Sequence, residues 1–422
     1  MPNTLAYRSP NPNTLVRATE VDDSGACDAT LDSRSFVPRS SASTPLSVAR
    51  TTVLPRKEGT GAEATLVATS RARFEPRRAL GEGGLGEVVA AVDQDIGREV
   101  AIKRLRPDMQ GTATVARFVD EIRTVGALEH PNIVPIHDVG VNEDGSLYFV
   151  MRCVQGETLE SVIERLAAGD PVAHAHWTMG RRVHVFRQIL DAVAFAHERG
   201  FVHRDIKPAN VMVGPHGEVF LMDWGIAKPI GAPEEPAWTR SASGRGALAT
   251  DRVTATHAGA VIGTPAYMSP EQARGEPVDA RSDIYSLCAL FHELLCLRHY
   301  LDHCRTVEAT LDGVQHAHAS APSFVSNPHQ SPAPMDLSWF VRKGLAKHAS
   351  GRYQSAREMI DRLDAREEGL IPIQCPVTLT KRVTRELLRS LDRHPMLFMV
   401  ALVLVVLTGV SFGIWRLVGG HA

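Results

Sequence analysis

Apolar residues follow two different periods in the middle of the chain. The runs Val88–Val92 and Glu99–Lys103 are short, rich in β-branched residues and separated by turn-forming residues, which predicts two neighbouring strands. Segments 113–128 and 181–198 instead place apolar residues three and four positions apart, which predicts two amphipathic helices. Strand and helix patterns therefore follow one another within one continuous region.

That region continues with two more strands and then with helices. Residues 211–213 and 219–221 are predicted strands, and the pattern from Asp283 to about Glu368 is mostly helical. Strands first and helices later favour a two-lobed α+β fold. We expect this domain to span residues 74–365.

The chain before this domain has a different composition. Residues 1–70 are rich in Ser, Thr, Pro and Asn, poor in aromatic residues and without a sustained period, which predicts a disordered tail. The tail is either a spacer or a carrier of modified Ser and Thr residues, and composition alone does not choose between the two.

The C-terminal part contains a predicted transmembrane helix. Residues 396–415 are twenty residues without a charged side chain, enough to cross a hydrocarbon core of about 30 Å as a helix. A buried core helix is the alternative, but such a helix usually keeps a polar stripe, and none is visible in this sequence.

Flanking charges give the predicted helix a direction. A basic juxtamembrane linker, 366–395, precedes it, and only Arg416 follows, in the short tail 416–422. The basic residues nearest the helix are Lys381, Arg382, Arg385, Arg389 and Arg393. The positive-inside rule therefore predicts a single-pass protein of the cell inner membrane, held in the lipid bilayer by this helix, with the large domain in the cytoplasm and the tail outside.

Charge and cysteine content narrow the function classes. With 46 basic and 48 acidic residues, the formal net charge is −2, which gives no electrostatic reason to expect a nucleic-acid partner. The six cysteines include no C-x-x-C pair. A reducing compartment is therefore expected rather than a disulfide framework.

A glycine-rich segment leads into the first predicted strand. Gly81, Gly83 and Gly86 fit the pattern G-x-G-x-x-G-x-V, which ends at Val88, and such glycines let backbone amides approach a polyphosphate closely. A dinucleotide-binding turn contains similar glycines but should open a helix, whereas a strand pattern follows here. The second strand ends in Val100-Ala101-Ile102-Lys103, which matches the V-A-I-K strand of protein kinases.

Three later motifs have fixed residue types at many positions. They are His203-Arg204-Asp205-Ile206-Lys207-Pro208-Ala209-Asn210, Asp223-Trp224-Gly225 and Gly263-Thr264-Pro265-Ala266-Tyr267-Met268-Ser269-Pro270-Glu271. Their order and separations agree with the protein-kinase motif set. On these residues the chain, from about Phe74 to Asp364, resembles the bacterial eukaryotic-like (Hanks-type) Ser/Thr protein kinases. The resemblance implies a bilobal fold with a small β-rich N-lobe and a larger helical C-lobe.

The resemblance also implies roles for the catalytic positions. Asp205 would accept the proton of the substrate hydroxyl, and Lys207 would steady the γ-phosphate. Lys103 would hold the α- and β-phosphates with Glu121 as its ion-pair partner, because Asp120 lies on the wrong helix face. Phosphoryl transfer needs mainly positioning and charge neutralisation, which these residues would supply.

The same resemblance implies the cofactors, ATP and Mg²⁺ (or Mn²⁺). Asn210 and Asp223 would offer the hard oxygen ligands that such a cation prefers. The implied ATP-binding residues are Leu80, Gly81, Glu82, Gly83, Gly84, Leu85, Gly86, Glu87, Val88 and Lys103. A lysine at Lys207 is typical of Ser/Thr kinases, so the expected substrates are proteins with Ser or Thr hydroxyls.

Some matching positions are interpreted as structural. Glu271 would pair with Arg352 in a late helix, and Asp283 would brace the catalytic loop that His203 begins.

Trp224, Arg152 and Cys288 depart from the family pattern. Trp224 replaces Phe, so a larger ring must pack beneath the helix that carries Glu121, which leaves the balance of active and inactive states open. Cys288 stands where relatives often have Gly, and with His292 and Cys296 it falls at i, i+4 and i+8, as zinc ligands on one helix face could. Burial in the implied central helix of the C-lobe explains these residues better, because cysteine is often buried.

The expected function is membrane-anchored signalling by an active Ser/Thr protein kinase that phosphorylates its own activation loop, in trans within a kinase dimer. Thr254 and Thr256 are the predicted regulatory phosphosites, with Arg204 as the phosphate receiver and Thr264 as a weaker candidate. The middle of this segment is rich in small and polar residues, so an inert linker is the alternative.

Other function classes fit less well. A catalytically inactive kinase fold that serves as a scaffold is disfavoured because every catalytic position keeps its chemistry. A small-molecule kinase of similar fold is disfavoured by Gly263-Thr264-Pro265-Ala266-Tyr267, a peptide-substrate platform in the family.

Overall fold

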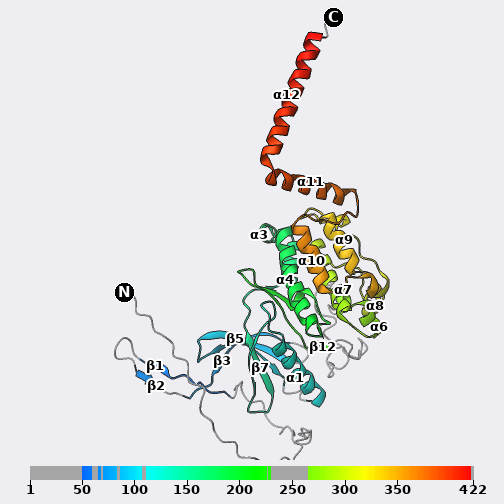
Figure 1. Ribbon diagram of the computed structural model, residues 1–422. Helices are drawn as coiled ribbons and strands as arrows, with labels where there is room; N and C mark the ends of the chain where they lie inside the picture. The colour runs from blue at the N-terminus through cyan, green and yellow to red at the C-terminus, as the bar shows by residue number, and fades with distance from the viewer. Residues whose placement is uncertain are drawn as a thin grey trace, which may run out of the picture. The chain divides into compact units, whose positions relative to one another are not determined.

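An antiparallel five-stranded sheet forms the N-lobe (Figure 1). In the computed structural model, the strand order is β3-β4-β5-β7-β6. The strands are β3 (Phe74–Glu82), β4 (Gly86–Asp93), β5 (Arg98–Leu105), β6 (Ile136–Val141) and β7 (Leu147–Arg152). The structure describes residues 50–58, 65–67, 70–82, 86–106, 111–225, 227–229 and 265–419.

The N-lobe sheet is held by two small apolar clusters. Phe74, Val100 and Tyr148 belong to one cluster of buried side chains. The other contains Phe118 of helix α1 (Thr112–Ala127) and Phe149 of β7, whose ring centroids are 5.4 Å apart. Helix α1 is thereby fixed against the sheet that carries Lys103.

The C-lobe is mainly helical, and its core surrounds α7 (Ala280–Cys296), which is buried along nearly its whole length. Phe186 and Phe291 stack with ring centroids 4.0 Å apart and join α4 to α7. The other helices of this lobe are α2 (Leu159–Ala167), α3 (Pro171–His176), α4 (Met179–Glu198), α6 (Pro270–Arg274), α8 (Val307–His316), α9 (Met335–Gly344) and α10 (Ala356–Glu367).

Short strands flank the motif segments 203–210 and 223–225. β10 (Val211–Val213) pairs antiparallel with β11 (Val219–Leu221) and with β8 (Glu157–Thr158). β9 (Phe201–Val202) pairs with β12 (Lys228–Pro229). The predicted strands at 88–92, 99–103, 211–213 and 219–221 and the helices at 113–128 and 181–198 are confirmed, with small shifts at their ends.

Part of the segment that precedes the kinase-like motifs is folded. β1 (Arg56–Glu58) pairs with β2 (Thr65–Val67), and the backbone amides of Val53 and Leu54 each donate to Asp95 Oδ1 at 2.9 Å. Arg50 forms an ion pair with Asp138 at 2.7 Å. The expectation of disorder through residue 70 is therefore wrong for residues 50–58 and 65–67. Composition missed this segment because three-residue strands show no readable period.

Cys288 packs into the C-lobe core against Gly344 of α9. The thiol is fully buried, and a Cβ added at Gly344 would overlap its sulfur. His292 Nε2 lies 2.9 Å from the Ser320 carbonyl and 3.7 Å from Cys296 Sγ. Within the described ranges, no group of three or more His, Cys, Asp or Glu side chains could hold a metal ion.

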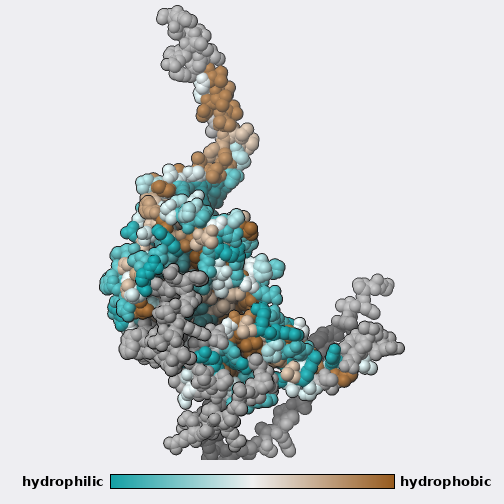
Figure 2. All heavy atoms as spheres, turned by 180° about the vertical axis from the view of Figure 1, so that it is seen from behind, coloured by the Kyte–Doolittle hydropathy of each residue, from teal (hydrophilic) through white to brown (hydrophobic). Residues whose placement is uncertain are grey.

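Two helices follow the C-lobe. α11 (Pro376–Arg393) and α12 (Pro395–Gly419) are consecutive, and the predicted helix 396–415 lies within α12. Figure 2 shows hydrophobic residues gathered along the described part of α12. In the part of the chain that the structure describes, no single helix meets the length and hydropathy of a membrane span. α11 together with Phe398–Ser411, bent by 102°, meets them by length and composition. The span itself stays a prediction.

Candidate active site

The segment 203–210, the expected catalytic loop, is anchored by a buried carboxylate. Asp283, in the first turn of α7, accepts hydrogen bonds from the backbone amides of His203 and Arg204 at 2.8 Å each, and its Oδ2 lies 2.8 Å from His197 Nε2. Although burial works against it, these groups hold the pKa of Asp283 below its ordinary value. Arg204 has a φ of 72°, a left-handed conformation that the paired carboxylate helps to maintain.

Asp205, Lys207 and Asn210 converge within this loop. Lys207 Nζ donates to Asp205 Oδ2 at 2.8 Å. The Asn210 side-chain nitrogen donates to the Asp205 carbonyl at 2.8 Å and to its Oδ2 at 3.1 Å. Because the amide nitrogen of Asn210 is used in this way, its amide oxygen remains the atom that can bind a cation.

The Asp223 segment adjoins the same loop. His203 Nε2 lies 3.1 Å from the Met222 carbonyl, and the His203 ring centroid is 4.5 Å from that of Trp224. Trp224 is 2% exposed and belongs to the large C-lobe core, and its indole nitrogen donates to the Leu221 carbonyl at 3.3 Å. The larger ring is therefore accommodated in the core, and Asp223 adopts a φ of 60° beside it.

Lys103 of β5 connects the two lobes. Its Nζ donates to Glu121 Oε1 at 2.5 Å and lies 3.7 Å from Asp223 Oδ1. Glu121 is 4% exposed, whereas Asp120 points to solvent. The predicted choice of Glu121 as the partner of Lys103 is thus confirmed.

Burial leaves this ion pair incompletely compensated. Burial raises the pKa of Glu121, although Lys103 counteracts it, and Asp223 adds to the rise. The pKa of Lys103 is also raised, because Glu121 and Asp223 together outweigh burial. Among the described residues, Glu121 Oε2 has no hydrogen-bond partner, and a Cβ added at Gly225 would lie 3.1 Å from it. Glycine at this position therefore lets the chain pass close to the carboxylate.

The glycine-rich segment joins β3 to β4. Gly81 pairs with Val88 across the hairpin, and Gly86 begins β4, where a Cβ would overlap the Arg104 carbonyl. Glu87 forms an ion pair with Arg104. The strand that follows these glycines agrees with the prediction and argues against a dinucleotide-binding turn. Leu80 and Glu82 lie in β3, and the expected ATP contacts Gly83, Gly84 and Leu85 lie outside the described residues.

Comparison with known proteins gives the family. The model of the protein kinase domain matches residues 74–362. The chain belongs to the protein kinase family. A probable serine/threonine-protein kinase of Streptomyces coelicolor is 38% identical over 68% of this chain and 39% of its own length.

Two further relatives have similar coverage. The serine/threonine-protein kinase PknD of Protochlamydia amoebophila is 34% identical over 69% of this chain and 30% of its own length. The corresponding values for PknB of Mycolicibacterium smegmatis are 35%, 73% and 45%. The chain therefore spans less than half the length of these curated relatives.

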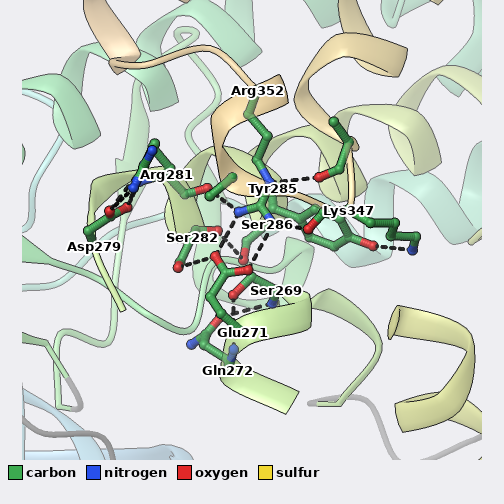
Figure 3. Close-up of polar contacts among 12 residues, drawn as sticks. Ser269, Glu271, Gln272, Asp279, Arg281, Ser282, Tyr285, Ser286, Lys347 and Arg352 are labelled. Atoms are coloured by element: carbon green, nitrogen blue, oxygen red, sulfur yellow. Dashed lines mark hydrogen bonds and ion pairs between the residues drawn. The ribbon is translucent and has the colours of Figure 1, made fainter. Parts of the chain in front are cut away.

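The kinase domain contains a second buried ion pair, far from Lys103 in the sequence (Figure 3). Arg352 donates to both carboxylate oxygens of Glu271, at 2.7 and 2.8 Å, and also to the Ala346, Lys347 and Arg281 carbonyls. The predicted Glu271–Arg352 pair is confirmed. Arg352 lies in the loop before α10, not in a helix as expected.

Helix α6, which carries Glu271, is also tied to the catalytic loop. Ser269 and Gln272 form a reciprocal capping box at its start, and the Gln272 side-chain nitrogen donates to the Arg204 carbonyl at 3.1 Å. Arg204 is buried. The predicted phosphosites Thr254 and Thr256, and Thr264, lie outside the described residues.

Sequence reasoning missed one polar group beside this site. Tyr267 donates a hydrogen bond to Glu293 of α7, and its ring packs edge-on against His299 with centroids 4.8 Å apart. Burial raises the pKa of Glu293 to about 7, although the Tyr267 hydroxyl counteracts it and Glu160 adds to the rise. The sequence signal was Glu293, an acidic residue among the apolar residues of a buried helix. This pattern indicates a buried polar group but does not predict Tyr267 as its partner.

Proposed function

We propose that the protein is an ATP-dependent Ser/Thr protein kinase that transfers the γ-phosphate of ATP to Ser or Thr hydroxyls of proteins. The observation that carries the proposal is the closed Lys103–Glu121 ion pair with Asp223 3.7 Å from the same ammonium group. A protein kinase requires this lysine–glutamate pair and this aspartate to be in place together. The relatives named above support the Ser/Thr class.

The oxygen atoms of the site fit a hard divalent cation such as Mg²⁺ or Mn²⁺. Asn210 keeps its amide oxygen available, and the Asp223 carboxylate is 52% exposed beside Lys103. Held by these two residues, the cation would bind the phosphates of ATP and neutralise part of their charge. Lys103 would add one positive charge on the α- and β-phosphates.

Asp205 and Lys207 would handle the acceptor hydroxyl. Asp205 Oδ2 is fixed by hydrogen bonds from Lys207 and Asn210, so it can orient the hydroxyl and receive its proton. Lys207 Nζ, 2.8 Å from that oxygen, would hold the γ-phosphate beside it. These residues position groups and balance charge, which is the main contribution a protein makes to phosphoryl transfer.

The proposal includes a membrane anchor and self-regulation. The uncharged segment 396–415 within α12 and the basic residues before it support a single-pass anchor in the cell inner membrane, with domain 74–365 in the cytoplasm. Trans-autophosphorylation of Thr254 and Thr256 would switch the activation segment through buried Arg204.

A phosphotransfer assay on the purified full chain tests the catalytic part. Radiolabelled ATP, Mg²⁺ and a generic protein substrate should give labelled protein with the wild type and background label with Asp205→Asn. Asp120→Asn, at an exposed neighbour of Glu121, is the matched control and should behave as the wild type. An inactive wild type would overturn the proposal in favour of a scaffold, whereas an active Asp205→Asn variant would overturn the role proposed for Asp205.

Two further measurements address the other parts. Deleting residues from 395 onward should let an alkaline carbonate wash release the protein from the membrane without detergent, and a full chain released in the same way would contradict the anchor. Mass spectrometry should find phosphate on Thr254 or Thr256 in the wild type and none in Asp205→Asn. Full activity of the variant with both Thr254→Ala and Thr256→Ala would exclude the phosphorylation switch but would leave the proposed kinase activity unaffected.

A further inference from the structure

Helix α11 has two opposite faces of different chemistry. One face contacts the C-lobe: Lys381 Nζ donates to Asp336 Oδ1 at 2.8 Å, and Arg385 Nη1 donates to the Arg366 carbonyl at 2.6 Å. Asp336 is also paired with Arg366. Although burial works against it, Lys381 and Arg366 hold the pKa of Asp336 below its ordinary value. This face is therefore electrostatically fixed to the C-lobe.

The other face is apolar and exposed. Val383 and Leu387 each follow a contact residue, Lys381 or Arg385, by two positions. Two positions on an α-helix correspond to a rotation of about 200°, so these side chains point away from the C-lobe. The apolar residues on this side of α11 are 40% to 56% exposed: Leu379, Val383, Leu387 and Leu391.

Charge and chain continuity indicate what covers this face. α11 carries five basic and two acidic residues, and Arg393 in its last turn immediately precedes the apolar helix α12. The two helices meet at a bend of 102°. A helix that lies flat in a bilayer surface and continues into a helix that enters the bilayer would need about this angle.

We propose that α11 is a membrane-surface helix. Its apolar face would be buried at the headgroup–acyl boundary of an anionic phospholipid bilayer, with Arg382 and Arg393 at the rim against lipid phosphates. The opposite face carries the C-lobe through Lys381 and Arg385. α11 would thus hold the kinase domain against the membrane surface at a fixed face. This inference rests on the proposed anchor in α12 for the position of the bilayer.

Site-directed fluorescence on the reconstituted full chain tests the inference. Single cysteines at Val383, Asp392 and Val405 would carry a bimane label, in a background where the native cysteines outside the buried core are serine. Val383 and Asp392 are nine positions apart, which places them on opposite sides of α11, and Val405 lies in α12. The vesicles contain equal parts phosphatidylcholine and phosphatidylglycerol, with nitroxide-labelled lipid as quencher.

Each outcome has a distinct meaning. A nitroxide near the headgroup should quench the Val383 label several-fold more than the Asp392 label, and this difference should shrink in vesicles of phosphatidylcholine alone. A mid-chain nitroxide should quench the Val405 label. Equal quenching at Val383 and Asp392 would overturn the inference. This result is also expected if a second copy of the chain, rather than lipid, covers the apolar face. No quenching at Val405 would overturn the anchor, whereas quenching at Val383 would still support the surface helix.

A charge-inserting variant supplies an independent readout. Leu387→Glu should weaken the lipid contact of a label at Val383 several-fold, because a carboxylate cannot enter the acyl boundary without a large desolvation cost. Asp392→Glu, which keeps the charge on the opposite side, is the matched control and should leave quenching unchanged. Unaltered quenching in Leu387→Glu would contradict burial of this face.

Discussion

The kinase domain holds two buried glutamates, Glu271 and Glu121, whose pKa values are shifted in opposite directions. Glu271 accepts two hydrogen bonds from Arg352 and one from Ser282, and these lower its pKa to about 2 although burial works against them. Glu121 accepts one from Lys103, and burial raises its pKa. A pair that only holds the fold can satisfy every atom, whereas a lysine that must also meet phosphates cannot be fully committed to its partner.

Breaking the satisfied pair should have the largest effect. Arg352→Ala should lower the free energy of unfolding by about 3–5 kcal/mol, because it leaves the Glu271 carboxylate buried without a counter-charge. Arg281→Ala is the matched control, since Arg281 pairs with Asp279 at the surface, and it should cost at most about 1 kcal/mol. Urea unfolding measures both, and equal losses would remove the distinction between the two sites.

Breaking the incompletely compensated pair should affect activity more than stability. Lys103→Ala should lower phosphotransfer by about 10²–10³-fold, comparable with the loss of a transition-state donor. It should destabilise the fold less than Arg352→Ala does, because Glu121 can take up a proton when its lysine is gone. Phosphotransfer rates and urea unfolding of the same samples give the comparison. A large stability loss with activity kept per folded molecule would contradict it.

Acid titration should separate the two glutamates by sign. The pKa of Glu271 is lowered in the folded state, so its contribution is present above the unfolded pKa and is lost as the pH falls from about 4.5 towards 2, by about 3 kcal/mol. The pKa of Glu121 is raised in the folded state, so the contribution of Glu121 to folding stability falls as the pH rises above the pKa that this group has in the unfolded chain.

The measurement is the unfolding free energy against pH for wild type, Glu271→Gln and Glu121→Gln. The stability lost by Glu271→Gln relative to wild type should shrink towards low pH. For Glu121→Gln, stability relative to wild type should rise with pH in the mildly acidic range. If the stability differences of the two variants from wild type changed with pH in the same direction, the two pairs would not differ in the way proposed.

The smallest effect is expected at Trp224, which lies next to Asp223 and thus near the Lys103 pair. Trp224→Phe removes the hydrogen bond to the Leu221 carbonyl and should cost about 1–2 kcal/mol of unfolding free energy. Activity should stay within several-fold of wild type, because the ring is buried in the C-lobe core, where a phenyl ring keeps most of the apolar packing. Loss of activity without loss of stability would instead make Trp224 a determinant of the closed Lys103–Glu121 pair.

The residues proposed for catalysis could be named from the sequence because the resemblance to protein kinases gives them fixed motif positions. Asp205, Lys207 and Asn210 lie within one short loop, and the structure brings their side chains together. Glu121 could be chosen over Asp120 because only one face of α1 can meet the sheet.

Other contacts were not readable in the sequence. The pairing of Tyr267 with Glu293 depends on which polar groups the folded core encloses together. The hydrogen bonds from Val53 and Leu54 to Asp95 join segments more than forty residues apart through backbone amides, which carry no sequence signal. The basic linker was visible as charge, but its two-faced helix required knowledge of which side contacts Asp336.

The contact between Cys288 and Gly344 limits the order in which the two positions can evolve. A side chain at position 344 overlaps the sulfur, so Gly344→Ala becomes acceptable only after Cys288 has been replaced by a smaller residue. The reverse order passes through an overpacked intermediate in the core. Once position 344 has gained a side chain, a return to cysteine at 288 carries the same overpacking cost. The pair therefore behaves as an epistatic ratchet: substitutions at its two positions are history-dependent, although each residue alone has ordinary chemistry.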